Sequence, residues 1–185
     1  DLYANLRPVK NVPTIPTRFE GVDLVIVREN TEDLYSGLEH EVVPGVVESL
    51  KIITEKASTR IARFAFDYAW RHQRRRITAV HKANVIKVSE ALFLREVRKV
   101  AKEFPEVAYD EQLIDSMAAL LVRDAARFDV VVTTNMFGDI LSDEASELSG
   151  SLGLAGAVNA SATHCMAQAQ HGSAPDIAGQ DKANP

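Results

Sequence analysis

Hydrophobic and polar positions along the chain form short apolar runs and longer stretches with helical spacing. Residues 22–27, VDLVIV, are an apolar run interrupted only by Asp23, which predicts a buried strand that delivers the polar loop RENTEDLYSG. From Thr54 to His72 the apolar residues recur at helical spacing, and Thr54 is a suitable N-cap. The pattern therefore predicts a buried strand and, further along, an amphipathic helix.

The alternation continues through the middle of the chain. It predicts strands at residues 76–82, 106–113 and 128–134, and helices at residues 89–104, 114–127 and 138–148. Strands that alternate with helices imply an α/β layered fold. From Gly150 onward the sequence becomes rich in glycine, alanine and serine, which predicts a boundary between residues 1–150 and 151–185.

Composition narrows the class of protein. The 185 residues, 46% of them hydrophobic, are enough for one domain, or for one domain and part of another. A net charge of -5 argues against nucleic acid or an anionic membrane as the main partner. Cys165 is the only cysteine, so no internal disulfide exists and a reducing compartment is compatible. We expect a soluble protein of the cytoplasm, or of the mitochondrial matrix in a eukaryote.

The segment NMFGDILSDEASE carries the most informative acids. Asp139 and Asp143 are four residues apart, so a helix that begins near Gly138 would place them on one face. Such a pair is tolerated at a helix N-terminus, where the helix dipole favours acids. Alternatively, the two carboxylates bind a hard divalent cation such as Mg²⁺ or Mn²⁺. Asp115 could supply a third oxygen, although by itself it is more typical of an N-terminal cap.

Basic residues and a tyrosine near the expected ends of strands are candidates for binding a substrate or transferring a proton. Arg7 and Arg28 suit bidentate binding of carboxylates, or else form surface ion pairs. Lys82 follows an apolar run, where partial desolvation would lower its pKa, or it is simply solvated. Tyr35 is a possible proton donor, or a packing residue. The run of three arginines at residues 74–76 is typical of a solvated helix end.

Five motifs occur in order along the chain: LYANLRP, VRENTEDLYSG, VHKAN, NMFGDILSDEASEL and HGSAPDIAG with a following ANP. Together they resemble the NAD(P)-dependent β-decarboxylating dehydrogenases, the family of isocitrate and 3-isopropylmalate dehydrogenases. The resemblance implies two open α/β domains with the active site in the cleft between them. Residues 1–150 would be the smaller domain, which binds substrate and metal and forms the dimer, and residues 151–185 part of the large domain.

The resemblance also implies a role for individual residues. Arg7 and Arg28 match arginines that bind the substrate carboxylates, and Tyr35 matches the tyrosine that protonates the enolate after loss of CO₂. Lys82 matches the lysine that handles the hydroxyl proton in the neighbouring subunit's site. Asp115, Asp139 and Asp143 match the ligands of Mg²⁺ or Mn²⁺, with Asp115 contributed by the partner of a homodimer.

A cofactor site is implied in the same way. Asn84 matches a residue near the nicotinamide, whereas His171, Gly172 and Asn184 match residues along the adenosine half. Asp176 can accept hydrogen bonds from the ribose hydroxyls of NAD but repels the 2′-phosphate of NADP. Because Ile177 follows and no base lies between residues 171 and 179, the loop favours NAD.

Several alternatives stay open at this point. The loop ENTEDLYSGLEHEVVPGVVES favours isocitrate as the substrate, but 3-isopropylmalate, homoisocitrate and tartrate enzymes belong to the same family. The segment CMAQAQHG has Gln168 where the family often has glutamate. The chain resembles an internal fragment, because the first part of the large domain is missing from it. It could also be a non-catalytic regulatory subunit, or an inactive dimerisation fragment.

Overall fold

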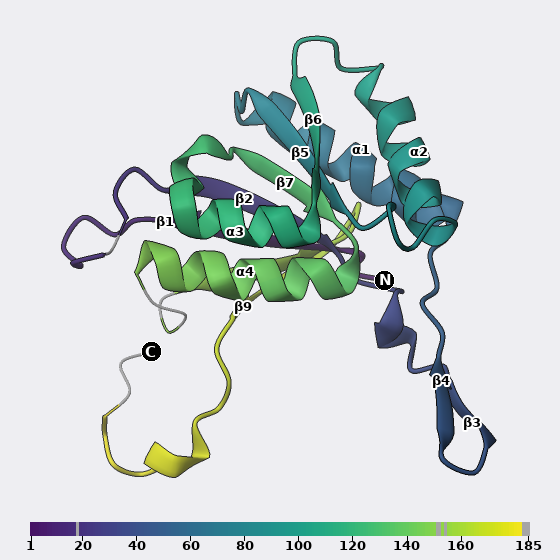
Figure 1. Cartoon of the computed structure of the whole chain (residues 1–185). Helices are drawn as coiled ribbons and strands as arrows, with labels where there is room; N and C mark the ends of the chain where they lie inside the picture. Colours follow the sequence, from purple (N-terminus) through teal and green to yellow (C-terminus); the bar gives the residue numbers. More distant parts are fainter. Residues whose placement is uncertain (18, 151–152, 154, 183–185) are drawn as a thin grey trace.

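A computed structural model of the chain describes residues 1–17, 19–150, 153 and 155–182, which form an α/β fold around one mixed sheet (Figure 1). The strand order is β6-β5-β7-β2-β1-β8-β9. In chain order these strands are β1 (Ala4–Lys10), β2 (Asp23–Glu29), β5 (Arg76–His81), β6 (Ala108–Leu113), β7 (Val130–Thr133), β8 (Gly156–Ala160) and β9 (Cys165–Ala169).

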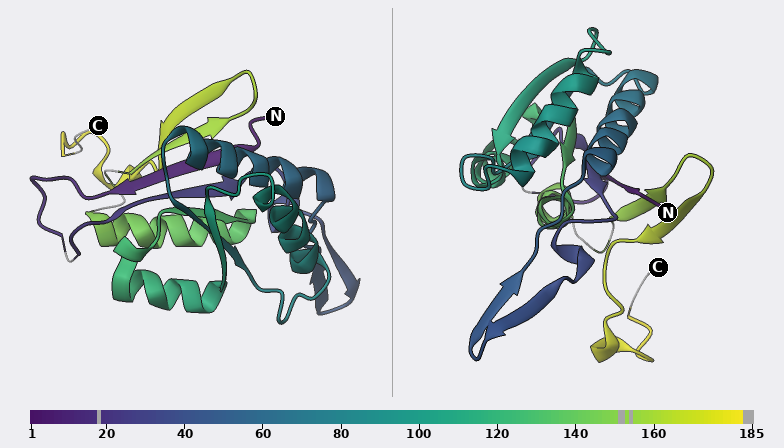
Figure 2. Two further views of the ribbon diagram at one scale, coloured as in Figure 1. Left: turned by 90° about the horizontal axis from the view of Figure 1, so that it is seen from above. Right: turned by 90° about the vertical axis from the view of Figure 1, so that its right-hand side faces the viewer.

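Helices cover both faces of the sheet, as the turned views show (Figure 2). The helices are α1 (Glu55–Arg71), α2 (Ser89–Ala101), α3 (Ile114–Asp124) and α4 (Asn135–Ser149). Alternate residues of a strand point to opposite faces, so Val25 and Val27 pack with α1 and α2, while Leu24 and Ile26 pack with α3 and α4. A buried strand between two helical layers is the reason that residues 24–27, LVIV, are all apolar.

Strands β2, β7, β5 and β6 run parallel to one another. Their carboxyl ends therefore lie along one edge of the sheet, where ligand sites of α/β proteins are found. The polar segment after β2, the start of α4, the turn after β5 and the start of α3 all lie at this edge. The order of the strands thus brings the candidate residues to one side of the molecule.

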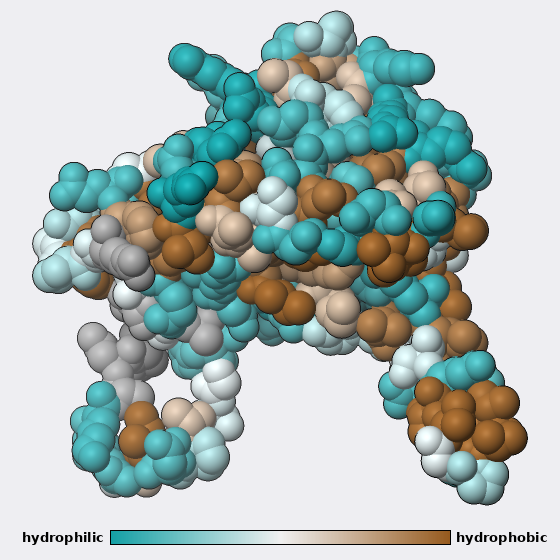
Figure 3. Space-filling view, viewed as in Figure 1, coloured by the Kyte–Doolittle hydropathy of each residue, from teal (hydrophilic) through white to brown (hydrophobic). Residues whose placement is uncertain are grey.

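A two-stranded hairpin projects from this body (Figure 1). It consists of β3 (Glu39–Val43) and β4 (Val46–Ser49), and it is not part of the large sheet. Val42, Val43, Val46 and Val47 are 50%, 54%, 51% and 66% exposed. The space-filling view shows them as a hydrophobic surface at the hairpin (Figure 3). Across the described residues, no helix is both long and apolar enough to cross a bilayer.

The predicted α/β fold is confirmed, with specific differences. Thr54 caps α1, because its side chain accepts a hydrogen bond from the Ala57 N–H. Helix α4 begins at Asn135, three residues earlier than expected. Arg7 lies in the middle of a strand, β1, that the apolar pattern did not indicate. Arg74 is not a solvated helix end, since it forms ion pairs with Asp23 and Asp129.

The end of α4 coincides with the boundary predicted at residue 150, but the sheet extends across it. Strand β8 pairs with β1 in antiparallel register, with Asn5 opposite Asn159. Strand β9 then pairs with β8. The division of the chain into two domains stays a prediction, and residues 156–169 belong to the same sheet as the rest.

Candidate active site

Arg7 and Arg28 lie on neighbouring strands and point to the same face of the sheet. In the antiparallel register of β1 and β2, Arg7 is opposite Ile26 and Asn5 is opposite Arg28, so the arginines are on the Ile26 face, which α4 covers. Both are buried, with 8% and 6% of their surface exposed. Two buried guanidinium groups side by side repel each other, so nearby acids must compensate for their charge.

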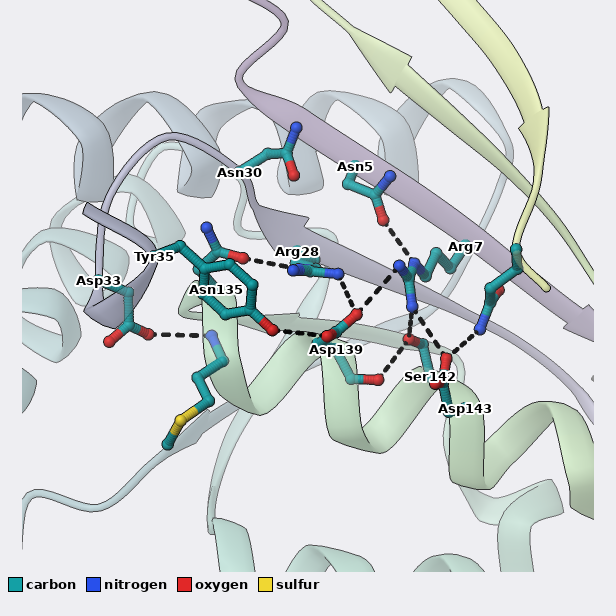
Figure 4. Close-up of polar contacts among 12 residues, drawn as sticks. Asn5, Arg7, Arg28, Asn30, Asp33, Tyr35, Asn135, Asp139, Ser142 and Asp143 are labelled. Atoms are coloured by element: carbon teal, nitrogen blue, oxygen red, sulfur yellow. Dashed lines mark hydrogen bonds and ion pairs between the residues drawn. The ribbon is translucent and has the colours of Figure 1, made fainter. Parts of the chain in front are cut away.

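Helix α4 supplies those acids (Figure 4). Asp139 Oδ1 is 3.1 Å from Arg7 Nη2 and also pairs with Arg28 Nη1. Asp143 Oδ1, one turn further along, is 3.1 Å from Arg7 Nη1. The predicted placement of Asp139 and Asp143 on one helix face is thus what the structure shows. The arginines offset the repulsion between the two carboxylates. The alternative explanation from the helix dipole involved no such ion pairs.

The charges of the cluster shift the ionisation of its members. Burial lowers the pKa of Arg7 below its usual value, and Arg28 adds to this effect, whereas Asp139 and Asp143 oppose it. Burial disfavours the charged form of Asp139, but the hydrogen bond from Tyr35 and the charges of Arg28 and Arg7 outweigh it and lower its pKa. The lowered pKa keeps the Asp139 carboxylate ionised at neutral pH.

Tyr35 joins the same cluster from the short 3-10 helix η1 (Leu34–Ser36). Its hydroxyl donates a hydrogen bond to Asp139 Oδ2 at 2.6 Å, and the Arg28 guanidinium lies 5.0 Å from its ring centre. The hydrogen bond to Asp139 raises the pKa of Tyr35 above its usual value. The hydroxyl therefore stays protonated at neutral pH, and the side chain is exposed to solvent.

A buried amide network fixes Arg7 from the opposite side. Arg7 Nε donates to Asn5 Oδ1 at 2.6 Å, and Asn5 Nδ2 donates to Asn159 Oδ1 at 2.7 Å. Asn159 lies on β8, so the last part of the chain supports the arginine. This network leaves Arg7 with little rotational freedom, as a carboxylate-binding group requires.

Three further side chains contact the cluster that the sequence did not single out. Asn135 Oδ1 accepts a hydrogen bond from Arg28 Nε at 2.8 Å, Ser142 accepts one from Arg7, and Gln170 Nε2 donates to Asp143 Oδ1 at 2.7 Å. Asn135, Asp139 and Ser142 are spaced i, i+4 and i+7, as on one helix face. This spacing from Asp139 was a signal that could have identified Asn135 and Ser142. Gln170 is distant in the sequence and gave no such signal.

Lys82 and Asp115 form a second group, at the carboxyl ends of β5 and β6. Lys82 Nζ is 2.5 Å from Asp115 Oδ1, and the Asp115 side chain is 64% exposed. The hydrogen bond from Lys82 lowers the pKa of Asp115. Asp115 lies in the first turn of α3 and is not its cap, since Leu113 takes that position. This pair faces outward and does not join the Tyr35 cluster.

The described residues contain no group of three or more His, Cys, Asp and Glu side chains placed to hold a metal ion. Asp139 and Asp143 share a site, but Asp115 is on another part of the edge. Within the described residues, Asp115 therefore does not complete a three-carboxylate site with Asp139 and Asp143. The oxygen ligands and the lowered pKa of Asp139 suit a hard cation such as Mg²⁺.

The C-terminal loop borders an open cavity of about 740 Å³. His171, Gly172 and Ile177 line it, together with Asp181 and Lys182. Asp176 lies beside it in the 3-10 helix η4 (Pro175–Ile177) and is not among the lining residues. Asn84 is exposed in the turn after β5, away from the cavity, and Asn184 lies outside the described residues.

The whole chain, residues 1–185, matches a protein family described as isocitrate/isopropylmalate dehydrogenase. It is 52% identical to isocitrate dehydrogenase [NAD] catalytic subunit 5, mitochondrial, of Arabidopsis thaliana, of which it covers 50%. It is 51% identical to the chloroplastic 3-isopropylmalate dehydrogenase of Solanum tuberosum, of which it covers 52%. Both alignments use 100% of this chain, which thus spans about half the length of these curated relatives.

A solved structure agrees with these matches. The crystal structure of isocitrate dehydrogenase from Methylococcus capsulatus superimposes with a TM-score of 0.96 at 48% sequence identity. The superposition covers 100% of this chain and 56% of that one. The arrangement of strands and helices described above therefore matches part of that isocitrate dehydrogenase structure over the whole length of this chain.

Proposed function

Because this chain belongs to the isocitrate/isopropylmalate dehydrogenase family, we propose that the protein containing it oxidises and decarboxylates isocitrate, with NAD⁺ and Mg²⁺ or Mn²⁺. The observation that carries the proposal is the cluster at α4. Two buried arginines and the Tyr35 hydroxyl contact Asp139, and Asp143 pairs with one of those arginines, Arg7. A hydroxy acid with several carboxylates needs this set of groups for binding, charge balance and proton donation.

The arginines are the substrate-binding groups of the proposal. Their planar guanidiniums match the fork of a carboxylate, and their burial strengthens the interaction. Arg7 is held by Asn5 and Ser142, and Arg28 by Asn135, so neither needs to be ordered when substrate arrives. This preorganisation keeps the entropic cost of binding low.

Asp139 and Asp143 would hold the divalent cation, with Asp115 from a second copy as the third ligand. When bound, the metal would stabilise negative charge on substrate oxygens and NAD⁺ would accept the hydride. Lys82 takes up the proton of the substrate hydroxyl as the ketone forms. Tyr35, whose hydroxyl is protonated at neutral pH, donates its proton to the carbon that has lost CO₂.

The separation of Lys82 from the Tyr35 cluster supports a homodimer with shared sites. Lys82 and Asp115 face outward and pair with each other within the chain. Exposed apolar side chains lie nearby on the turn after β5 and on α4, namely Val85, Val88 and Ile140. A second copy that covers these residues would bring Lys82 and Asp115 to the neighbour's arginines.

The experiment is a spectrophotometric screen of the full-length protein. Isocitrate, homoisocitrate, 3-isopropylmalate and tartrate are each tested with NAD⁺ and with NADP⁺, in Mg²⁺ and in EDTA. We expect NADH formation with isocitrate and Mg²⁺, and none in EDTA. A rate that EDTA leaves unchanged would contradict the proposal, as would a preference for another acid.

A second candidate is 3-isopropylmalate. The identity to the Solanum tuberosum 3-isopropylmalate dehydrogenase, 51%, nearly equals the 52% to the Arabidopsis thaliana isocitrate dehydrogenase subunit, so overall similarity does not separate the substrates. The two acids differ in one side chain, a charged carboxymethyl group against an apolar isopropyl group. The screen distinguishes them directly, because a site shaped for one rejects the other.

The role of Lys82 is tested by Lys82→Met in the full-length protein. As a general acid or base, Lys82 should contribute a factor of about 10² to 10⁴ to turnover. Lys87→Met is the matched control, because Lys87 is an exposed lysine in the same turn. Equal and small effects of the two changes would remove Lys82 from the mechanism.

A further inference from the structure

A buried group of three charged residues lies between Tyr35 and Lys82. Lys51 Nζ is 2.7 Å from Asp33 Oδ1 and 3.1 Å from Glu90 Oε1. The Lys51 side chain is 12% exposed, and those of Asp33 and Glu90 are 0% exposed. Two buried carboxylates share one ammonium, and replacing a buried ion pair by apolar groups of similar volume is often neutral or stabilising. Stability alone therefore does not account for this group.

One side of the group reaches the backbone of Lys82. Glu90 lies in the first turn of α2, and its Oε2 accepts the Lys82 N–H at 3.0 Å. Its Oε1 has no hydrogen-bond partner among the described residues and faces the Lys51 ammonium. Glu90 thus joins Lys51 to the first residue after β5, so the position of that turn depends on this carboxylate.

The other side reaches the turn that carries Tyr35. Asp33 Oδ1 accepts the Leu34 N–H at 2.8 Å, and its Oδ2 accepts the Met136 N–H at 3.0 Å, at the start of α4. The backbone of Asp33 has a φ of 77°, a conformation that residues other than glycine rarely adopt. Such a backbone persists only where surrounding contacts enforce it. The Asp33 carboxylate makes those contacts.

We propose that Lys51 is a positioning residue that holds the Tyr35 and Lys82 turns in place through Asp33 and Glu90. Its ammonium also lies 4.7 Å from the centre of the Phe137 ring and 3.4 Å from Thr134 Oγ1, both at the start of α4. The inference rests on the proposed function, in which Tyr35 and Lys82 transfer protons. It adds Lys51, Asp33 and Glu90, which contact the backbone of the two turns and the start of α4.

The test compares two glutamates of α2 in the full-length enzyme. Glu90→Gln leaves one oxygen and one donor nitrogen, so the side chain cannot serve both Lys51 and the Lys82 N–H as the carboxylate does. Glu96→Gln is the matched control. Glu96 is 2% exposed and binds Arg95 and Lys99, with no contact to either turn. Both changes remove a buried charge from the same helix.

We expect Glu90→Gln to lower kcat by about 10- to 100-fold while KM for the hydroxy acid changes less than about twofold, because the arginines are not disturbed. Hydrogen–deuterium exchange of peptides containing Lys82 should be faster by at least about tenfold. Glu96→Gln should lower the melting temperature comparably and change neither quantity. Equal kcat and equal exchange in the two variants would overturn the proposal.

Lys51→Met is the second variant, and it removes the shared cation. It should lower kcat at least as far as Glu90→Gln, and Lys51→Arg should recover part of the loss. Wild-type levels of kcat and exchange in Lys51→Met would overturn the proposal. If the wild-type enzyme oxidises none of the acids, the proposed function fails, whereas the exchange at Lys82 still decides whether Glu90 holds that turn.

Discussion

Arg28 lies across Gly138 so closely that no side chain fits between them. A Cβ added at Gly138 would be 2.6 Å from Arg28 Cγ and 2.7 Å from its Cβ. Gly138 lies inside α4, where alanine is ordinarily more favourable by about 1 kcal/mol. The glycine is thus retained against helix propensity, because it allows the arginine to lie flat on the helix.

Gly138→Ala should therefore raise KM for the hydroxy acid by about tenfold and lower the free energy of unfolding by about 1–3 kcal/mol, because it overpacks the site. Steady-state kinetics and urea unfolding of the full-length protein measure the two effects. Gly156→Ala is the control, since nothing lies within 4 Å of its added Cβ. A stabilised Gly138→Ala enzyme with unchanged KM would show that Arg28 moves freely.

The proposed preference for NAD⁺ rests on a single residue, Asp176. Asp176→Asn removes a negative charge beside the cavity and keeps an oxygen for a ribose hydroxyl. We expect it to raise kcat/KM for NADP⁺ relative to NAD⁺ by at least about tenfold. Asp181→Asn is the informative control, because Asp181 lines the cavity itself. A larger gain from Asp181→Asn would assign the discrimination to that residue instead.

At the scale of elements, the apolar pattern predicted the strands and helices between residues 22 and 149 well, apart from the hairpin. It missed β1 because ANLRPVK has polar side chains where a buried strand is usually apolar; Asn5 and Arg7 are buried there by hydrogen bonding to each other and to distant residues. Pro8 is tolerated because β8 pairs only with residues 4–6 of β1. A pattern of apolar residues within one segment does not predict hydrogen-bond partners or paired strands that are distant in the sequence.

The candidate site shows the same limit. Local spacing placed Asp139 and Asp143 together, and the family motifs supplied Arg7, Arg28 and Tyr35. The group around Lys51 escaped notice, because its three charged residues come from separate elements and none of them is remarkable in its own segment. Contacts that depend on the pairing of distant segments require the three-dimensional structure.

Arg74, in the turn between α1 and β5, pairs with acids at β2 and next to β7. We expect these ion pairs to make the free energy of unfolding depend on pH. The two acids are Asp23 at the start of β2 and Asp129 just before β7. Burial disfavours ionised Asp23, but hydrogen bonds from Arg74 and Lys10 outweigh this and lower its pKa. The resulting stabilisation is present above the unfolded-state pKa of about 3.9 and is lost as the pH falls through the lower folded-state value.

Arg74→Gln should accordingly cost about 1 kcal/mol at pH 7, and the difference from wild type should shrink below about pH 4. Urea unfolding followed by circular dichroism at pH 7 and pH 3 measures both values. Arg75→Gln removes the same charge from an exposed neighbouring residue and should have little effect at either pH. A difference that is independent of pH would mean that Arg74 acts by packing alone.

At the scale of the whole molecule, we expect the second copy of the proposed homodimer to cover the β3–β4 hairpin as well. A two-stranded hairpin with four exposed valines is not stable by itself. Val47→Glu should therefore shift the full-length protein from dimer to monomer in sedimentation and abolish NADH formation. Val12→Glu, at an exposed valine outside the hairpin, should do neither. An active Val47→Glu monomer would refute the sharing of sites.

The distance between the Tyr35 cluster and the Lys82–Asp115 pair has a genetic consequence. If each site takes Tyr35 from one chain and Lys82 from the other, two defective alleles can restore activity together. A Tyr35→Phe chain assembled with a Lys82→Met chain forms one site with both intact residues and one with neither. Co-expression of two inactive alleles should then yield mixed dimers with about half the wild-type activity, so heterozygotes would show complementation within a single gene.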